Sequence, residues 1–383
     1  MNHRRALAFW AHGGEVREME WTVVGKGPAG LLAASILTLH GEKIRIVAEH
    51  EGSLGLWSGC LDYGQSSCLS LTLEQWQRLW RMIMRLWASL GVPSHMGAGY
   101  TMTCTGLLKP TFLCPSWQYF STNPAPVWIV GFDGLVDSLQ EVHAARLEDA
   151  IGKGVSWQRL PKPLLWREDW TTMTWAAFLE TEEGLQWLRA HLTDLNAKIP
   201  PGWPLLLPQV VGYSQTLVLL RNLAHQFHRR IFEYPLITPA LGGMRIRGAW
   251  QAWLRGHDVP IIAGRVTDYR HNRVVLDDGR SWPTDHVILA TGGLLGGGMR
   301  IRPSGNVEET ISHRTMGTIR GDNWDEVFRL GVTAEESVSA CGRERAGWDP
   351  DRDHNGGLML LGTVYQSLSE QGLDILMSEA MGA

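Results

Sequence analysis

The chain has 383 residues, 44% of them hydrophobic, so it can bury a sizeable core, and its length indicates about two domains. Its 35 basic and 39 acidic residues nearly balance, which argues against nucleic acid or an anionic membrane as the main partner. No apolar run reaches the roughly 18 residues that a membrane-spanning helix needs. These features favour a cytoplasmic globular protein.

Residues 1–18 carry neither a periodic pattern nor an apolar segment of signal-peptide length. We expect them to be a disordered extension, and Met19 is an alternative start of translation. The 19 tryptophans of the chain are expected in the core or on a partner-facing surface.

The five cysteines, Cys60, Cys68, Cys104, Cys114 and Cys341, are odd in number and widely spaced. No two of them form a CxxC motif, so their spacing predicts neither an iron–sulfur ligand set nor a disulfide framework. The pattern is typical of buried thiols in a cytoplasmic protein, and we expect no metal site.

Residues 21–49 predict one βαβ unit whose first turn is rich in glycine. Apolar residues 21–24 indicate a strand, residues 31–40 a helix that Gly41 ends, and residues 44–49 a second strand. A GxGxxG motif, typical of dinucleotide-binding turns, stands between the first strand and the helix. It consists of Gly25, Lys26, Gly27, Pro28, Ala29 and Gly30.

Each glycine of the motif has its own expected role. Gly25 permits the tight turn, Gly27 lets a pyrophosphate approach the backbone, and Gly30 lets the helix pack against the strand. The helix N-terminus offers N–H groups and partial positive charge to the phosphates. Glu49 stands 19 residues after Gly30 (49 − 30), where a carboxylate accepts hydrogen bonds from an adenosine ribose. The alternative is a structural turn without a ligand.

The next segment combines a polar loop, a helix and extended chain. Gly and Ser are frequent in residues 52–62, beyond the carboxyl end of the second strand, where ligands bind in open α/β sheets. Residues 72–90 predict an amphipathic helix that Thr72 and Gln75 begin and that Gly91 ends. Residues 96–118 are polar and extended.

A second α/β pattern begins at Val127. We expect strands at 127–132, 155–160 and 204–211, with helices at 135–153, 173–195 and 214–230, and another helix ending at Arg255. This alternation favours a small parallel sheet of its own. Its first turn, residues 131–134, has too few glycines for a second dinucleotide turn.

The first pattern then resumes. Short strands at 261–267, 273–277 and 281–283 form a meander with a hairpin turn at Gly279, and residues 286–293 form an apolar strand ending in Ala-Thr-Gly-Gly. Asp349 and a glycine pair precede a last helix over 358–370. The small residues that should approach a cofactor there are Ala290, Thr291, Gly292, Gly293, Gly356 and Gly357.

Together these patterns predict an α/β protein with a Rossmann-like two-dinucleotide-binding flavoprotein fold and an inserted second α/β domain. The Rossmann-like domain would comprise residues 19–95 and 256–383, and the inserted domain residues 96–255.

In this order the landmarks resemble the B-subunit family of the anaerobic glycerol-3-phosphate dehydrogenase, from Gly25 to Gly357. Beyond the nucleotide turn, they are Ser58-Gly59-x-x-Asp62, Gly106–Thr111, Val130–Asp137, Pro239–Arg245, Ala290–Gly293 with Gly296–Gly298, Gly347–Pro350 and Gly356–Gly357. Two features depart from the family: residues 337–345 are polar and charged where an apolar strand usually stands, and only Gly356 and Gly357 remain where the family has more glycines.

The resemblance implies a flavoprotein with FMN or FAD in a three-subunit complex. A catalytic flavoprotein subunit would oxidise glycerol 3-phosphate to dihydroxyacetone phosphate, and an iron–sulfur subunit would pass electrons to membrane quinone. This chain would reach the inner face of the membrane only through these partners. Glu49 and the complete GxGxxG motif favour FAD over FMN, because both suit an adenosine moiety.

Within this scheme, Ser58 and Gly59 would also contact the cofactor, and Asp349 would bind the ribityl chain or else cap the last helix. The flavin ring supplies the redox chemistry, so the protein binds and tunes it. A cation near the N1–C2 edge would stabilise the reduced ring; Lys109 and Arg245 are the candidates, and ordinary surface charges are the alternative. Two other functions stay open: a self-sufficient FAD-dependent small-molecule oxidoreductase, and a flavin-free structural subunit of the same complex.

Overall fold

The computed structural model describes residues 20–62, 69, 71–122, 126–152, 154–237, 239–319, 330–332, 335, 337–345 and 356–373. The fold is α/β, with two separate parallel sheets. The chain divides into two compact units. The first contains residues 1–50, 254–347 and 363–383, and the second contains residues 51–253 and 348–362. The expectation for residues 1–18 lies outside the described residues.

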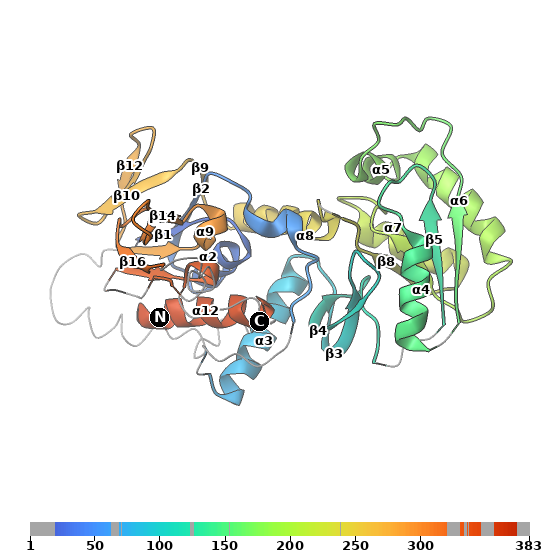
Figure 1. Ribbon diagram of the computed structural model, residues 1–383, viewed down its shortest axis with the longest axis horizontal. Coiled ribbons are helices and arrows are strands. Elements are labelled where there is room, and N and C mark those ends of the chain that lie inside the picture. Colours follow the sequence, from blue (N-terminus) through green and yellow to red (C-terminus); the bar gives the residue numbers. More distant parts are fainter. Residues whose placement is uncertain are drawn as a thin grey trace. The chain divides into compact units, whose positions relative to one another are not determined.

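A five-stranded parallel sheet forms the centre of the first unit (Figure 1). Its order is β17-β13-β1-β2-β9, so that β1 has its sequence successor on one side and the late strand β13 on the other. Such an order reverses direction at β1, as in doubly wound nucleotide-binding folds. The strands are β1 (Glu20–Val24), β2 (Lys43–Ala48), β9 (Ile261–Ala263), β13 (His286–Leu289) and β17 (Val338–Ala340).

Helix α2 (Pro28–Leu39) follows β1 directly and contacts β1, β2 and β13. Leu31, Leu32, Ile36 and Leu37 are at most 1% exposed, because this helix is apolar nearly all round and is buried. His40 caps its carboxyl end, and Gly41 follows with a φ of 72°. The expected strand–helix–strand unit is present, with each end within a few residues of its expected place.

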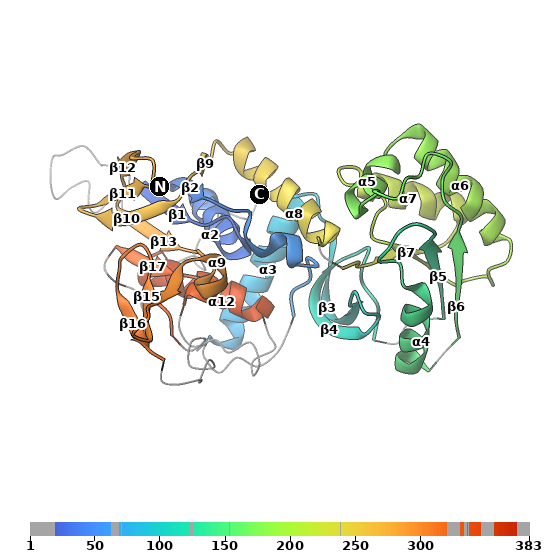
Figure 2. The same ribbon diagram turned by 45° about the horizontal axis from the view of Figure 1, so that its top comes forward.

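Two small antiparallel sheets complete the first unit (Figure 2). The meander consists of β10 (Val266–Arg270), β11 (Arg273–Leu276) and β12 (Ser281–Pro283), and its Val274 and Leu276 join the core formed by Val47 and Leu289. The expected strand over 261–267 is divided at Gly264, since β9 belongs to the parallel sheet instead. The third sheet was not predicted; it consists of β14 (Met299–Ile301), β15 (Asn306–Glu309) and β16 (Thr315–Thr318), with α9 (Gly293–Gly296) beside β14.

The polar appearance of residues 337–345 hides a strand. β17 lies at the edge of the parallel sheet and pairs with β13, with Leu289 opposite Ala340. Its Ser339 is fully buried, and its hydroxyl has a hydrogen-bond partner, the Ser367 hydroxyl of α12 (Gly356–Glu370), at 2.7 Å. A buried serine with a partner costs little, and so this strand needs no continuous apolar run. The strand leads into a short 3₁₀ turn, η2 (Gly342–Glu344).

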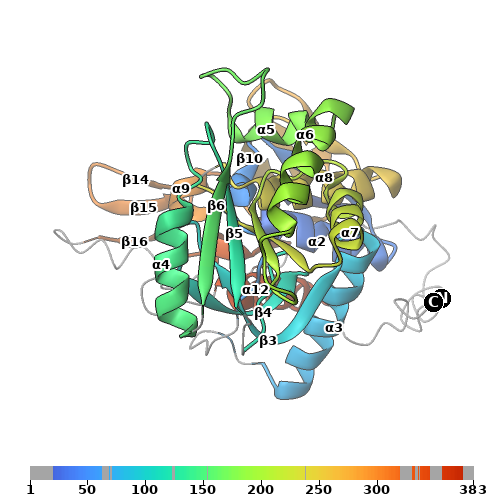
Figure 3. The same cartoon turned by 90° about the vertical axis from the view of Figure 1, so that its right-hand side faces the viewer.

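The second unit has a four-stranded parallel sheet in the order β6-β5-β7-β8. Figure 3 shows α4 running beside β6 and β5. Its strands are β5 (Val127–Phe132), β6 (Val155–Leu160), β7 (Leu205–Pro208) and β8 (Ile231–Tyr234). The helices between them are α4 (Gln140–Ile151), α5 (Thr172–Phe178), α6 (Glu182–Asn196) and α7 (Thr216–Phe227).

Two expectations for this unit need correction, and one strand was missed. The helix expected over 135–153 begins only at Gln140. The helix expected over 173–195 is two helices, because the Thr181 side chain accepts a hydrogen bond from the Gly184 amide and starts α6. Strand β8 was not predicted, since its Glu233 interrupts a short apolar run; that glutamate is paired inside the fold.

The remaining elements of the second unit are η1 (Gly52–Leu56), α3 (Leu73–Ser89), the hairpin of β3 (Ser94–Met102) with β4 (Leu108–Pro115), and α8 (Leu241–Gly256) up to residue 253. The last residues of α8, from Leu254, belong to the first unit. The expected capping box is present, with Thr72 and Gln75 bonded to each other's backbone N–H groups. The unit begins at residue 51, whereas the insertion was expected to begin at 96. This difference arises because Trp87 of α3 packs against Trp57 and Trp250.

Among the tryptophans in the described ranges, six are buried, nine are partly buried, and Trp157 is exposed. No helix in the described part of the chain is long and apolar enough to span a bilayer.

Candidate functional site

The carboxyl ends of three strands meet at Gly25. Its amide donates a hydrogen bond to the Val47 carbonyl at the end of β2 (2.7 Å), and the Ala290 amide donates to Val24 at the end of β1 (2.8 Å). The order of the sheet reverses at β1, so this is the switch point where open parallel sheets bind ligands. Gly25, Ala290 and Glu49 therefore stand at one edge of one sheet.

Glycine is required at positions 25 and 30 by the backbone itself. Gly25 has a φ of 111°, and a Cβ there would lie 2.2 Å from the Ala290 carbonyl oxygen. A Cβ on Gly30 would lie 2.0 Å from the Gly25 carbonyl oxygen. The loop after β1, the loop after β13 and the first turn of α2 are thus packed backbone against backbone, with no room for a side chain between them. The geometry matches the tight turn and the close helix packing expected of these two glycines.

Gly27 differs from its two neighbours. It is the N-cap of α2, with a φ of −70° and a ψ of −179°, a conformation open to every residue. Pro28 occupies the first turn, and no side chain of the described residues caps this helix. The first N–H groups of α2, those of Ala29 and Gly30 among them, therefore have no partner within the helix and point out of its positive end. This end suits an anion.

Residues 291–293 turn beside this helix end and hold a buried carboxylate. Glu344 accepts hydrogen bonds from the Thr291 hydroxyl and from the Gly293 amide (2.8 Å). Gly292 and Gly293 adopt positive φ values of 86° and 64°. Glu344 is fully buried, and its Oε1 has no hydrogen-bond partner among the described residues.

Burial, with a smaller contribution from the charge of Glu309, outweighs the two hydrogen bonds and raises the pKa of Glu344 to about 7. Sequence reasoning missed this residue, because it stands in the charged run 337–345. The signal available in the sequence was an acid flanked by two arginines, two residues after Gly342.

Glu344→Gln is expected to change how stability depends on pH. The pKa in the folded state lies above the ordinary 4.5, so unfolding free energy is lost as pH rises from about 4.5 to about 7. The loss should be about 3 kcal/mol for this group. A glutamine keeps an acceptor for Thr291 and Gly293 and does not ionise, so the variant should gain stability relative to the native chain at pH 8. Urea unfolding at pH 5 and pH 8 measures this.

Glu183→Gln, at an exposed glutamate of α6, is the control and should unfold as the native chain does at both pH values. If the unfolding free energies of the native chain and of Glu344→Gln change equally between pH 5 and pH 8, Glu344 is already ionised in the folded protein over this range.

Glu49 directly follows β2 at the same edge as Gly25. Its side chain is 47% exposed, with Arg265 Nε at 3.9 Å and His50 Nε2 at 3.6 Å. Both distances are long for hydrogen bonds, and the carboxylate keeps free acceptor positions. Its place relative to the glycine turn is the one expected for an acid that binds a ribose.

The other expected cofactor residues lie in the second unit and form a cluster there. Lys109 is paired with Asp62, with 2.6 Å between Nζ and Oδ2. A Cβ on Gly357 would lie 2.6 Å from the Asp62 amide nitrogen, and one on Gly59 would lie 2.2 Å from Ile246 Cδ1. Ser58, Gly59, Lys109, Gly356 and Gly357 thus share this unit, whereas Gly25–Gly30, Glu49 and Ala290–Gly293 share the other. Asp349 lies outside the described residues.

Arg245 is buried in the second unit, and its hydrogen-bonding groups are used there. Its side chain is 6% exposed and meets Glu233 at 2.5 Å and 3.1 Å. Its Nε and Nη2 donate to the Gly212 carbonyl at 3.0 Å and 2.6 Å. Burial raises the pKa of Glu233, and the guanidinium opposes this. Arg245 was expected to tune a flavin, but in the structure its charge is paired with Glu233.

The second sheet carries its own carboxylate at a helix start. Glu180 Oε1 accepts hydrogen bonds from the amides of Tyr213, Ser214 and Gln215, at 2.6–2.8 Å, where α7 begins. These hydrogen bonds hold the pKa of Glu180 below its ordinary value despite burial. An anion from outside would have to displace this side chain.

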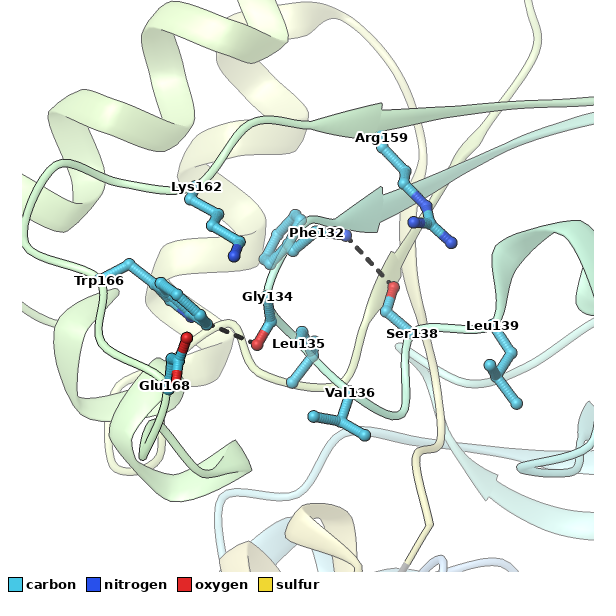
Figure 4. A pocket seen from close by; sticks show the side chains of 10 residues that line it. All are labelled: Phe132, Gly134, Leu135, Val136, Ser138, Leu139, Arg159, Lys162, Trp166 and Glu168. Carbon is cyan, nitrogen blue, oxygen red and sulfur yellow. Dashed lines mark hydrogen bonds between the residues drawn. The ribbon is translucent and has the colours of Figure 1, made fainter.

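A hollow of about 430 Å³ lies where β5 and β6 end (Figure 4). Its cations have partners: Lys162 Nζ lies over the Trp166 ring, 3.6 Å from the centroid, and Arg159 meets Glu141 at 2.9 Å. Trp166 Nε1 donates to the Gly134 carbonyl (3.3 Å). Among the described residues, no three His, Cys, Asp or Glu side chains come together as metal ligands.

Comparison with known proteins gives only distant likeness. No protein-family model and no curated protein matches the chain. The lathipeptide tryptophan 5-halogenase MibH shares 15% identity over 94% of this chain and 67% of its own, with a TM-score of 0.36. CabE, an aromatic hydroxylase from angucycline biosynthesis, shares 11% over 93% and 63%, with a TM-score of 0.33.

The 3-ketosteroid delta1-dehydrogenase from Sterolibacterium denitrificans shares 14% identity over 72% of this chain and 48% of its own, with a TM-score of 0.29. The chain spans about half the length of this dehydrogenase and about two thirds of the other two proteins. Likeness at this level assigns neither a cofactor nor a reaction to the chain.

Proposed function

We propose that the first unit binds FAD and that the chain is a flavin-dependent oxidoreductase. The observation that carries the proposal is the switch point at Gly25, where a helix N-terminus without a side-chain cap meets two other strand ends. Only glycine fits at positions 25 and 30, and the backbone N–H groups in the first turn of α2 suit a pyrophosphate. Bound flavin would supply the two-electron chemistry, and the chain would hold and orient it.

Each candidate ligand has a place in this proposal. The amides of the α2 first turn would bind the pyrophosphate, with Gly27 leaving room for it. Glu49 would accept hydrogen bonds from the adenosine ribose. The meander β10–β12 between β9 and β13 supports a two-dinucleotide-binding arrangement, because it packs on the sheet near the ends of β2 and β13. The backbone of Ala290–Gly293 would be the second segment that approaches the cofactor closely.

The proposed physiological role is a redox subunit of an anaerobic glycerol-3-phosphate dehydrogenase complex. This finer assignment rests on the sequence landmarks from Gly25 to Gly357, and its partners would be a catalytic flavoprotein subunit and an iron–sulfur subunit. Apolar side chains exposed on the second unit favour a partner, since Val136 is 83%, Leu139 41% and Leu165 56% exposed. Contact with a membrane would occur through these partners alone.

Two measurements test the proposal. Freshly purified protein should show flavin absorption near 450 nm, and its absence would favour the flavin-free structural subunit. Purification from the native cell should recover both partners, and the isolated chain should not reduce a dye with glycerol 3-phosphate. Dehydrogenase activity of the isolated chain would favour the self-sufficient oxidoreductase.

Glu49→Ala is expected to weaken the binding of FAD and to leave the binding of FMN almost unchanged. The carboxylate would contact only the adenosine ribose, and a lost hydrogen bond to a charged group costs about 1.5–3 kcal/mol. This corresponds to a rise of roughly 10- to 150-fold in the Kd of FAD. Titration of deflavinated protein with each flavin measures the difference. Asp278→Ala, at an exposed turn of the meander, is the control; an equal loss for FAD and FMN would remove Glu49 from the ribose site.

A further inference from the structure

Two cysteines 54 residues apart in sequence lie side by side in the second unit. The Sγ atoms of Cys60 and Cys114 are 3.1 Å apart. Cys60 is 6% exposed and Cys114 is fully buried. Both are free thiols. The candidate cofactor site of the first unit uses neither residue.

The backbone explains why these two side chains meet. Leu61 forms an antiparallel bridge with Leu113 of β4: the Leu61 amide donates to the Leu113 carbonyl at 2.7 Å, and the reverse bond is 3.1 Å. In this register Cys60 stands directly opposite Cys114. Leu61 and Leu113 form a hydrogen-bonded pair, so the neighbouring Cys60 and Cys114 occupy a non-hydrogen-bonded position. At such a position opposite Cα atoms are about 4.5 Å apart.

That separation lies inside the range of about 4.4–6.8 Å that disulfides span between Cα atoms. The two sulfurs need approach by only about 1 Å to reach the length of an S–S bond. A bond here would require no change in strand register.

The geometry points to a redox-active dithiol: Cys60 and Cys114 are oxidised by a small hydroperoxide to an intramolecular disulfide, and a thiol reductant restores them. Because Cys114 is fully buried and Cys60 nearly so, the oxidant must be small. A protein thiol or a bulky disulfide does not fit at the pair as it stands.

The chemistry assigns a different part to each thiol. Burial raises the pKa of the Cys60 thiol, but the hydrogen-bonding groups around it, Cys114 first and Ser58 as well, hold that pKa below its ordinary value. Burial, and then Cys60 itself, raise the pKa of Cys114 well above its ordinary value. Cys60 is therefore the thiolate nucleophile, and Cys114 is the thiol that resolves the intermediate.

The steps balance. The Cys60 thiolate attacks one peroxide oxygen, the O–O bond breaks, and the products are a sulfenic acid and hydroxide. Cys114 then attacks the sulfenic sulfur, the S–O bond breaks, and the S–S bond forms. The sulfenic oxygen leaves as water, with the Cys114 proton. Counting the proton that ionisation of Cys60 released, two thiols and one hydrogen peroxide give one disulfide and two waters.

The disulfide would fix the loop that carries Ser58 and Gly59 to β4. The Ser58 carbonyl already accepts a hydrogen bond from Gln118 Nε2 (3.0 Å), and Lys109 of β4 is paired with Asp62. Oxidation would therefore add a covalent bond to a contact that the folded chain already makes. The inference is independent of flavin binding.

The test uses the full chain, reduced, desalted and treated with stoichiometric hydrogen peroxide under native conditions. Intact mass should fall by about 2 Da. Alkylation before and after reduction, followed by proteolysis, should show a single linked pair of peptides, one containing Cys60 and the other Cys114. Dithiothreitol should restore both thiols.

Matched variants assign the roles. Cys114→Ser should stop at a Cys60 sulfenic acid that a dimedone reagent traps, and Cys60→Ser should leave Cys114 as a thiol. Cys341→Ser removes another buried thiol, whose pKa burial raises to about 12, and should form the disulfide as the native chain does. Recovery of both native thiols unchanged, or a dominant disulfide between other cysteines, would overturn the inference without any variant having to fold.

Discussion

Gly27→Val is expected to abolish flavin retention and to leave a folded protein. Gly27 has an extended conformation that valine adopts without strain, unlike Gly25 at a φ of 111°. Its replacement would therefore spare the turn but place a branched side chain at the α2 N-terminus, where the proposed pyrophosphate must approach the backbone. Flavin absorbance per mole of protein measures the loss, and circular dichroism shows whether the fold is kept.

Gly256→Val is the matched control in the same unit. Gly256 ends α8, is exposed, and has no atom within 4 Å of the position that a Cβ would take. The control should retain its full flavin content. If Gly27→Val binds as much flavin as the native chain, the pyrophosphate does not lie at this turn, whatever the chain otherwise binds.

Arg245→Met is expected to destabilise the second unit by about 3–5 kcal/mol, because it leaves Glu233 buried without its cation. Glu233 has no exposed surface, and the two side chains share two close contacts. Burial already raises the pKa of Glu233, so loss of the guanidinium should raise it further. Stability of the variant should then fall as pH rises, which urea unfolding at pH 6 and pH 8 measures.

The double variant Arg245→Met, Glu233→Leu separates structure from a flavin role. Replacing both charged partners by apolar residues removes the unpaired charge and should recover most of the lost stability. Normal flavin content and normal flavin potential in this variant would assign Arg245 to the fold. A changed potential with restored stability would return it to the cofactor.

Local sequence determined the first unit's βαβ segment closely. The apolar runs at 21–24 and 44–49 and the glycines at 25, 30 and 41 each act within a few residues, so pattern and structure agree. The Thr72–Gln75 capping box of α3, in the second unit, is local in the same way. Short elements were less predictable. Strand β17 contains a buried serine, and β8 contains a buried glutamate, because partners distant in sequence satisfy both side chains.

Tertiary structure alone decided which polar residues are available to a ligand. In the sequence, Lys109, Arg245 and Glu344 are charged residues with no visible partner, and Cys60 and Cys114 are unrelated thiols. The fold pairs Lys109 with Asp62 and Arg245 with Glu233, buries Glu344 against Thr291, and brings the two sulfurs together across an antiparallel bridge. Such pairings depend on register and burial over tens of residues, and no local pattern encodes them. The glycine turn, in contrast, can be recognised in the sequence because its three glycines stand within six residues, and Gly30 packs directly on the Gly25 carbonyl; only the contact of Gly25 with Ala290 required the tertiary structure.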